Sequence, residues 1–150
     1  MPQTFGCLHN HLVFSTKNRD PFLSAELRPR LFEYFGGILR AHGGYLVAAG
    51  GVEDHVHLLA GLSREMAVAE ALRLLKANSS KWVHETGAGP AEFAWQTGYA
   101  AFTVSLSKKG TVKRYLARQE EHHRTQTFQD EYRALLCRHG IAFDEQYLWD

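Results

Sequence analysis

The segment that most constrains this chain is an aliphatic run that contains two histidines, Glu53-Asp54-His55-Val56-His57-Leu58-Leu59-Ala60. Successive side chains of a β-strand point to opposite faces, so His55 and His57 share one face while Val56 and Leu58 share the other. Two neutral imidazoles on one face of a buried strand can bind one metal ion with fixed geometry. The run therefore predicts a buried strand with metal ligands on one side.

The His-x-His pattern is weak evidence by itself, because the chain has nine histidines and a second such pair, His9-Asn10-His11. Context separates the two pairs. His55 and His57 lie in an aliphatic strand after an acidic turn, whereas Asn10 interrupts the apolar pattern of its own segment. For His9 and His11, burial in the core is the more common outcome, and a supporting role beside the metal ligands is the alternative.

Length and composition predict one domain spanning residues 1–150, since 150 residues with 45% hydrophobic side chains can enclose a sizeable core. No apolar run approaches the roughly 18 residues that a membrane span needs, and the first residues lack the pattern of a secretory signal. We therefore expect a cytoplasmic protein with no membrane association. Cys7 and Cys137 are too few for a disulfide framework or a cysteine-based zinc motif.

The order of predicted elements is strand, helix, strand, strand, helix, strand, followed by two helices. This order predicts an α+β fold, the ferredoxin-like split βαββαβ arrangement with an antiparallel four-stranded sheet plus C-terminal helices. In it the first and third strands are central neighbours, which places His9 and His11 beside the histidine strand. The Gly50-Gly51 pair is an alternative turn before that strand. The predicted strands are 5–16, 45–52, a third that follows Glu53-Asp54, and 95–106. The predicted helices run from about 24 to 43, 63 to 87, 111 to 123 and 127 to 140. Ser63, Thr111 and Thr127 are the predicted N-caps of the last three, and Gly140 is predicted to end the final one.

The predicted third helix carries Tyr115 and Gln119, which are four residues apart and so reach toward the same point. A tyrosine hydroxyl becomes a usable nucleophile when an ion or cation lowers its pKa from about 10. Gln119 offers a neutral oxygen that suits Mg²⁺ or Mn²⁺. A core-packed Tyr115 and a solvated Gln119 are the alternative, which would be favoured if the histidine pair were absent.

Charge is unevenly distributed along the chain, although the net charge is only +1. Residues 108–118 contain five basic and no acidic side chains, whereas residues 119–150 are acidic overall. A local basic patch can bind phosphates while the total charge stays near zero. Polar donors late in the second helix also suit phosphate, a solvated helix face being the alternative. The candidate nucleic-acid contacts are Lys17, Arg19, Lys76, Lys81, Lys108, Lys113 and Arg114.

Several segments, taken together and in order, resemble the single-tyrosine HUH transposases of minimal bacterial insertion sequences, the IS200-like transposases, whose relatives are the REP-associated tyrosine transposases. Their co-occurrence over almost the whole chain is far more specific than any one of them. The segments are His11–Arg19, Asp54-His55-Val56-His57-Leu58-Leu59, Trp95-Gln96-Thr97-Gly98-Tyr99, Tyr115–Arg124, Phe128–Tyr132 and Asp144–Trp149.

The resemblance implies that His55, His57 and Gln119 bind Mg²⁺ or Mn²⁺ and that Tyr115 attacks a phosphodiester of single-stranded DNA. The product would be a 5′-phosphotyrosine link and a free 3′-OH at ends flanked by hairpins. It also implies a homodimer in which one subunit's tyrosine helix usually completes the other's site. The sequence leaves open whether Tyr115 acts in cis or in trans.

Two other functions remain open from the residues alone. A metal-dependent hydrolase or oxygenase would need a carboxylate near the histidines; Asp54 would point to the opposite face of a regular strand, while Glu53 would share their face. A ferredoxin-like nucleic-acid-binding protein would stack bases on strand aromatics without chemistry. Only a transposase needs Tyr115 as a nucleophile, so this residue discriminates among the three.

Overall fold

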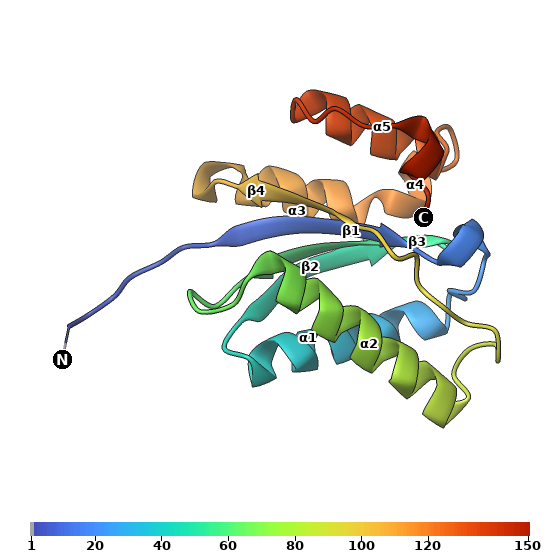
Figure 1. Cartoon of the computed structure of the whole chain (residues 1–150), viewed down its shortest axis with the longest axis horizontal. Helices are drawn as coiled ribbons and strands as arrows, with labels where there is room; N and C mark the ends of the chain where they lie inside the picture. The colour runs from blue at the N-terminus through green and yellow to red at the C-terminus, as the bar shows by residue number, and fades with distance from the viewer. Residues whose placement is uncertain (1) are drawn as a thin grey trace.

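A computed structural model describes residues 2–150 and builds them around one four-stranded sheet (Figure 1). The strands follow the order β2-β3-β1-β4 across the sheet, and all neighbouring pairs are antiparallel. The predicted α+β, ferredoxin-like βαββαβ arrangement is confirmed, with β1 and β3 as the central strands. The strands are β1 (His9–Ser15), β2 (Tyr45–Gly51), β3 (His55–Gly61) and β4 (Ala100–Val104).

One face of the sheet is covered by two helices, α1 (Leu27–Ala41) and α2 (Val68–Thr86) (Figure 1). Apolar residues that recur every three or four positions bury one side of each helix against alternate residues of the central strands. Each such buried side chain contributes roughly 1.5–3 kcal/mol relative to exposure, so this layer supplies most of the core. The buried residues here include Leu12, Phe14, Leu31, Phe35, Val56, Leu58, Leu72 and Leu75.

The opposite face carries a layer of three shorter helices, α3 (Lys109–Ala117), α4 (Gln119–His122) and α5 (Phe128–Arg138) (Figure 1). Its apolar cluster is smaller and is centred on α5 and β4. The buried members are Val13, Ala100, Phe102, Phe128, Tyr132, Leu135 and Leu136, with Leu148 and Trp149 packed against them. The two helical layers thus differ in how much apolar surface they bury.

The ends of α5 match the sequence pattern. The side chain of Thr127 accepts a hydrogen bond from the backbone N–H of Asp130 at 3.2 Å, which satisfies one of the free donors at a helix start. Gly140 follows the helix at φ +68°, a conformation that favours glycine. This helix is therefore specified by its own sequence at both ends.

Several predicted boundaries are wrong. The first strand begins at His9 rather than Phe5. His9 pairs with Gly61 and Val104, which are the last residues of the two neighbouring strands, so residues before His9 have no strand to pair with. The fourth strand covers only Ala100–Val104: Val104 already pairs with the first residue of β1, and before Ala100 the bridge between Thr16 and Trp95 is isolated from the ladder. The second helix begins at Val68, since Ser63 Oγ instead accepts the N–H of Glu65 at 3.1 Å in the preceding turn.

The predicted third helix is two helices. It starts at Lys109, directly after the 3-10 turn η2 (Leu106–Lys108), so Thr111 does not cap it. It breaks at Arg118, whose φ of −104° and ψ of 19° are not helical. Tyr115 and Gln119 consequently lie on either side of a kink.

Gly50 lies within β2 and not in a turn, which settles the alternative left open at Gly50-Gly51. A Cβ atom on Gly50 would lie 2.0 Å from the backbone oxygen of Leu116 and 3.3 Å from Cγ of Gln119. Glycine is therefore required for the close approach of α3 to the sheet.

The remaining regular elements are two further 3-10 turns, η1 (Lys17–Arg19) and η3 (Glu145–Tyr147). Cys7 and Cys137 are exposed and free. Across residues 2–150, no helix combines the length and apolar character needed to cross a membrane.

Candidate active site

The two histidines of β3 face the α3–α5 layer, and neither side chain is exposed to solvent. Their strand neighbours Val56 and Leu58 belong to the core under α1 and α2. The predicted alternation is therefore confirmed, and the histidines occupy the polar side of a strand whose other side is a hydrophobic core.

Each histidine forms a hydrogen bond through its Nδ1 atom, on the side of the ring away from Glu131. His55 Nδ1 donates to Asp54 Oδ1 at 2.7 Å, and His57 Nδ1 shares a 2.8 Å hydrogen bond with His11 Nε2. Such outer hydrogen bonds fix the ring orientation of metal-binding histidines and leave Nε2 free for the ion. The expectation that Asp54 points away is wrong, because Asp54 precedes the first residue of β3 and strand alternation does not apply to it.

Tyr115 and Gln119 both reach this point, despite the kink between them. Gln119 is 1% exposed, and its Oε1 lies 3.2 Å from His55 Nε2. The Tyr115 ring centroid lies 5.8 Å from that of His57. The four side chains predicted for catalysis and metal binding thus lie together within one chain.

Glu131, on α5, occupies the centre of the site and was not identified from the sequence. Its Oε1 lies 2.9 Å from His57 Nε2 and 3.3 Å from His55 Nε2, and its Oε2 accepts a hydrogen bond from the Tyr115 hydroxyl. It is only 2% exposed. The available signal was a charged residue inside the apolar stripe of α5, between Phe128 and Leu135.

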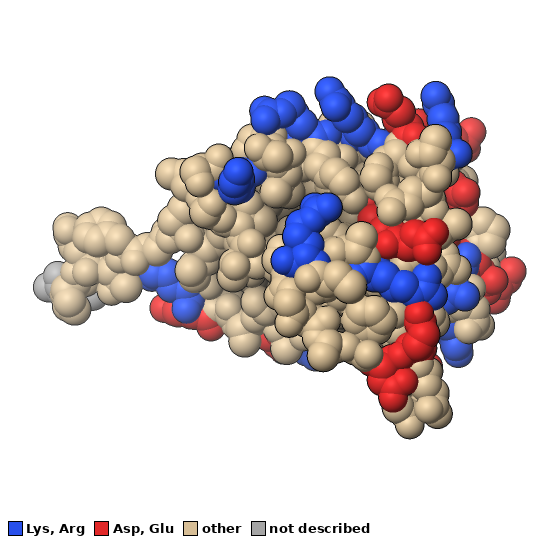
Figure 2. All heavy atoms as spheres, turned by 90° about the horizontal axis from the view of Figure 1, so that it is seen from above, with Lys and Arg blue, Asp and Glu red and all other residues tan. Residues whose placement is uncertain are grey.

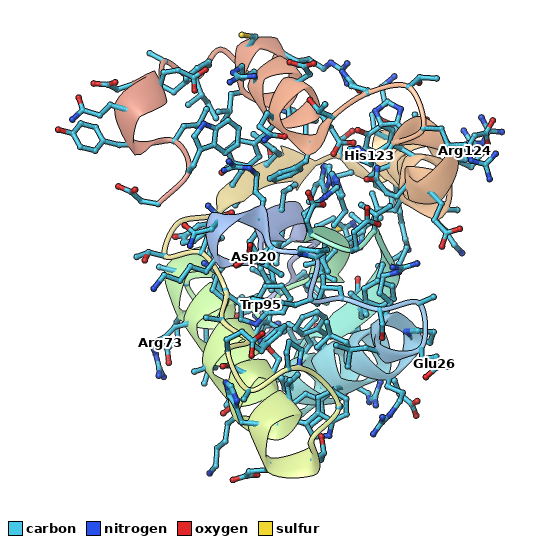
Figure 3. The ribbon with its side chains drawn as sticks, turned by 90° about the vertical axis from the view of Figure 1, so that its right-hand side faces the viewer. Asp20, Glu26, Arg73, Trp95, His123 and Arg124 are labelled. Carbon is cyan, nitrogen blue, oxygen red and sulfur yellow. The ribbon has the colours of Figure 1, made fainter. Side chains whose placement is uncertain are left out.

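Two more histidines complete the cluster. His123 Nε2 lies 3.1 Å from Gln119 Oε1 and 3.0 Å from Glu131 Oε1. Figure 3 shows His123 on the inner side of the chain between α4 and α5, while Arg124 points outward. His122 Nε2 is buried 3.4 Å from Glu131 Oε2 and has no hydrogen-bond partner among the described residues.

Burial and hydrogen bonding set opposing pKa shifts in this cluster. Burial lowers the pKa of His57 to about 4 and that of His11 to about 3, so both imidazoles are neutral at pH 7. Burial opposes the ionised form of Glu131, but hydrogen bonds from His123, His55 and His57 outweigh it and hold the pKa of this carboxyl well below its usual range. Burial and the contact with Glu131 raise the pKa of Tyr115, which disfavours its phenolate while no cation is present.

His55 is the exception among these imidazoles. Burial opposes its protonation, but hydrogen bonds to Asp54 and Glu131 outweigh that cost and raise its pKa. The side chain thus carries positive charge more readily than His57 does, next to the one buried carboxylate of the site.

The donor set fits a divalent ion. One ligand atom from each of His55, His57, His123 and Glu131 lies within 4.8 Å of all the others. Gln119 adds an amide oxygen at the same point. Mixed imidazole and oxygen donors suit Mn²⁺ better than Mg²⁺, which prefers oxygen alone. The unpaired His122 Nε2 shows that the polar atoms of the cluster are not fully satisfied by one another.

Tyr115 also lines an open groove of about 620 Å³. Lys108 and Arg138 also line it, whereas the ring of Phe102 is 4% exposed and already stacks on His139. The groove therefore places cations beside the tyrosine.

Comparisons with known proteins agree with this geometry. The sequence profile described as IS200-like transposase matches residues 4–119, which is most of the chain. This chain belongs to the IS200-like transposase family. A curated relative, the ISDra2 transposase TnpA of Deinococcus radiodurans, is 24% identical over 119 residues, which cover 76% of this chain and 85% of the relative.

Two solved structures share the fold of this transposase. The crystal structure of a transposase candidate from Deinococcus radiodurans R1 is 25% identical with a TM-score of 0.60, covering 79% of this chain and 98% of that one. A REP-associated tyrosine transposase bound to a REP hairpin has the same TM-score of 0.60 at 13% identity, covering 82% of this chain and 73% of that one. The second likeness concerns the fold alone.

The basic residues predicted to contact nucleic acid do not form one surface in the transposase. Lys108, Lys113 and Arg114 are exposed on η2 and α3, on the side of the sheet that carries Tyr115. In the view onto this side, basic side chains are scattered and acidic ones gather mainly toward the end away from the N-terminal arm (Figure 2). Lys17 and Arg19 lie in η1, where the Arg19 guanidinium stacks over the Trp149 ring at 5.1 Å.

The two lysines of α2 lie on the opposite face, away from the site. Lys76 Nζ donates to three backbone carbonyls, and its burial lowers its pKa to about 8. Lys81 lies 3.8 Å from Glu85 in an exposed ion pair. The structure therefore does not bring either residue to the site, because the sheet separates α2 from Tyr115.

Proposed function

We propose that this transposase cuts and rejoins single-stranded DNA with Tyr115 as the nucleophile. The observation that carries the proposal is the position of the Tyr115 hydroxyl, beside a buried cluster of metal donors and at the wall of a groove that Lys108 and Arg138 also line. A phenol in that position can reach both a bound ion and a phosphate in the groove.

In the proposed reaction, Tyr115 Oη attacks phosphorus and loses its proton, while the bond from phosphorus to the 3′ oxygen breaks. The 3′ oxygen takes up a proton and leaves as a free 3′-OH, and the DNA remains attached through a 5′-phosphotyrosine. Rejoining reverses these changes with a 3′-OH as the attacking group. One phosphodiester is exchanged for another, so no ATP is required.

The residues have separable roles in this scheme. His55, His57 and Gln119 would hold the divalent ion, which supplies charge stabilisation to the phosphate when bound. Asp54 and His11 keep the two imidazoles oriented through their Nδ1 atoms. Lys108, Lys113 and Arg114 would contact phosphates outside the site, which fixes the DNA strand relative to Tyr115.

We propose hairpin-flanked ends as the substrate, a choice supported by the bound REP hairpin of the structural neighbour. Mn²⁺ or Mg²⁺ is the proposed ion, Mn²⁺ being the better match to the imidazole donors. The proposed setting is the cytoplasm, with residues 1–150 acting as one domain. If two chains pair as a homodimer, each would keep its own site, because Tyr115 already lies beside the histidines of its own chain.

The test is to incubate the protein with labelled, hairpin-ended single-stranded DNA and Mn²⁺ and to look for a protein–DNA species that survives denaturation. Tyr115→Phe is the control and should form none. Binding that persists in EDTA without any adduct would favour a nucleic-acid-binding protein. Full activity of Tyr115→Phe on any substrate would favour a metal-dependent hydrolase.

A further inference from the structure

The two oxygens of Glu131 have different partners. Oε1 faces the Nε2 atoms of His57 and His123 at 2.9 and 3.0 Å. Oε2 accepts the hydrogen bond of the Tyr115 hydroxyl and lies 3.2 Å from Gln119 Nε2. A single carboxylate therefore connects the metal donors to the proposed nucleophile.

Glu131 comes from a part of the chain outside residues 4–119, the region that the family profile matches. Its helix is nevertheless firmly placed on the site. Phe128 and Tyr132 are 3% and 4% exposed, and both pack against Trp149 near the end of the chain. The guanidinium groups of Arg19 and Arg133 lie over the Trp149 ring, at 5.1 and 5.3 Å from its centroid. The C-terminal segment thus packs against the helix that carries Glu131.

A carboxylate at 2% exposure needs compensation, because a buried charge without partners costs several kcal/mol. The Nε2 atoms of His57 and His123 lie 2.9 and 3.0 Å from Oε1, the position at which added positive charge would stabilise the carboxylate. A divalent ion among the same Nε2 atoms would supply that charge. Carboxylate oxygen is also the donor that Mn²⁺ and Mg²⁺ prefer and that histidines and glutamine alone do not offer.

We propose that Glu131 is both a ligand of the ion, through Oε1, and the residue that positions the Tyr115 hydroxyl, through Oε2. This inference rests on the proposed function and adds a residue to it. One side chain then fixes the distance between ion and nucleophile, and the C-terminal helix α5 becomes part of the catalytic unit.

The two roles predict two separable effects of Glu131→Gln, which keeps the volume and removes the charge. Loss of the anionic ligand should weaken Mn²⁺ binding by about tenfold or more, the range seen when groups around metal sites are removed. Loss of the carboxylate acceptor should also slow adduct formation at saturating Mn²⁺, when ion affinity no longer matters. Tyr115→Phe should bind Mn²⁺ as the wild type does.

The experiment measures Mn²⁺ affinity by calorimetry and by electron paramagnetic resonance of the free ion, and the adduct rate as a function of Mn²⁺. The variants are Glu131→Gln, Glu131→Asp and His57→Ala, with Glu121→Gln as the control because Glu121 is an exposed acid of α4. Circular dichroism checks folding. If Glu131→Gln does not fold, the Glu131→Asp variant provides the test. It retains the negative charge, so it should bind Mn²⁺ within a few-fold of wild type. Its side chain is one methylene shorter, so it should position the Tyr115 hydroxyl less well and react more slowly.

The outcomes separate the two proposals. A wild-type protein that neither binds Mn²⁺ nor forms an adduct removes the proposed function. A wild-type protein that does both, with Glu131→Gln equal to it in affinity and saturating rate, removes only the roles of Glu131. A Glu131→Asp variant as fast as wild type at saturating Mn²⁺ overturns the positioning role.

Discussion

The two faces of the sheet use the same strands for opposite purposes. Toward α1 and α2, β3 presents Val56 and Leu58 to a continuous apolar core. Toward α3, α4 and α5, the same strand presents His55 and His57 to a buried polar cluster beside a smaller apolar one. The comparison shows the larger apolar core on one face and the buried polar donors on the other. If the proposed function is right, stability and chemistry divide between the faces, and substitutions at adjacent positions of β3 can test this division.

The largest effect on activity is expected from His57→Ala. Losing an ion ligand removes several kcal/mol of transition-state charge stabilisation, and each 1.36 kcal/mol is a factor of ten in rate, so the adduct rate should fall by about 10³-fold or more. Because the side chain belongs to the polar cluster and not to the main core, circular dichroism should remain native. A His57→Ala variant that reacts at the wild-type rate would break the division.

The adjacent substitution Leu58→Ala should do the reverse. Leu58 is fully buried on the other face, and truncating such a leucine costs about 2–5 kcal/mol of unfolding free energy. Urea unfolding should show this loss, while the adduct rate of the folded fraction stays close to wild type. A specific loss of rate without loss of stability would mean that the two faces are not separate.

Gly50→Ala should lower the adduct rate by displacing α3, which carries Tyr115, from the sheet. Its Cβ would lie 2.0 Å from the Leu116 backbone oxygen, so α3 must move away from β2. A displacement of about 1 Å at Tyr115 and Gln119 can cost about 10²-fold in rate. The control is Gly37→Ala on α1, whose Cβ would meet only the end of the Arg40 side chain at 3.8 Å, and it should leave the adduct rate unchanged.

The smallest effect is expected from single cations. Lys113→Ala should weaken single-stranded DNA binding a few-fold and reduce the slope of log K against log salt by about 0.7, as for one lost contact to single-stranded phosphate. Lys81→Ala, on the opposite face, is the matched control and should change neither. Equal effects of the two substitutions would show that DNA contacts both faces.

Local sequence was enough to predict much of this molecule. The alternation around His55 and His57, the order of elements and the cap at Thr127 each depend on neighbours within a few residues, and each is confirmed. Tyr115 and Gln119 were identified from their spacing, and the structure places both at the histidines, although the continuous helix assumed for them is wrong.

The features that the sequence did not predict depend on distant contacts. The strand boundary at His9 depends on where two other strands end, and the role of Lys76 depends on carbonyls more than twenty residues away. Glu131 lies 74 residues from His57, and nothing in its own neighbourhood specifies that partner.

The sequence by itself therefore determined the layered fold and the face on which the histidines lie, and it paired Tyr115 with Gln119 by their spacing, because backbone periodicity and side-chain polarity act locally. Only the tertiary structure decided that Tyr115 meets the histidines of its own chain and that Glu131 joins them. Those contacts arise when separate elements pack on one face of the sheet, and burial then forces their polar groups to find partners there.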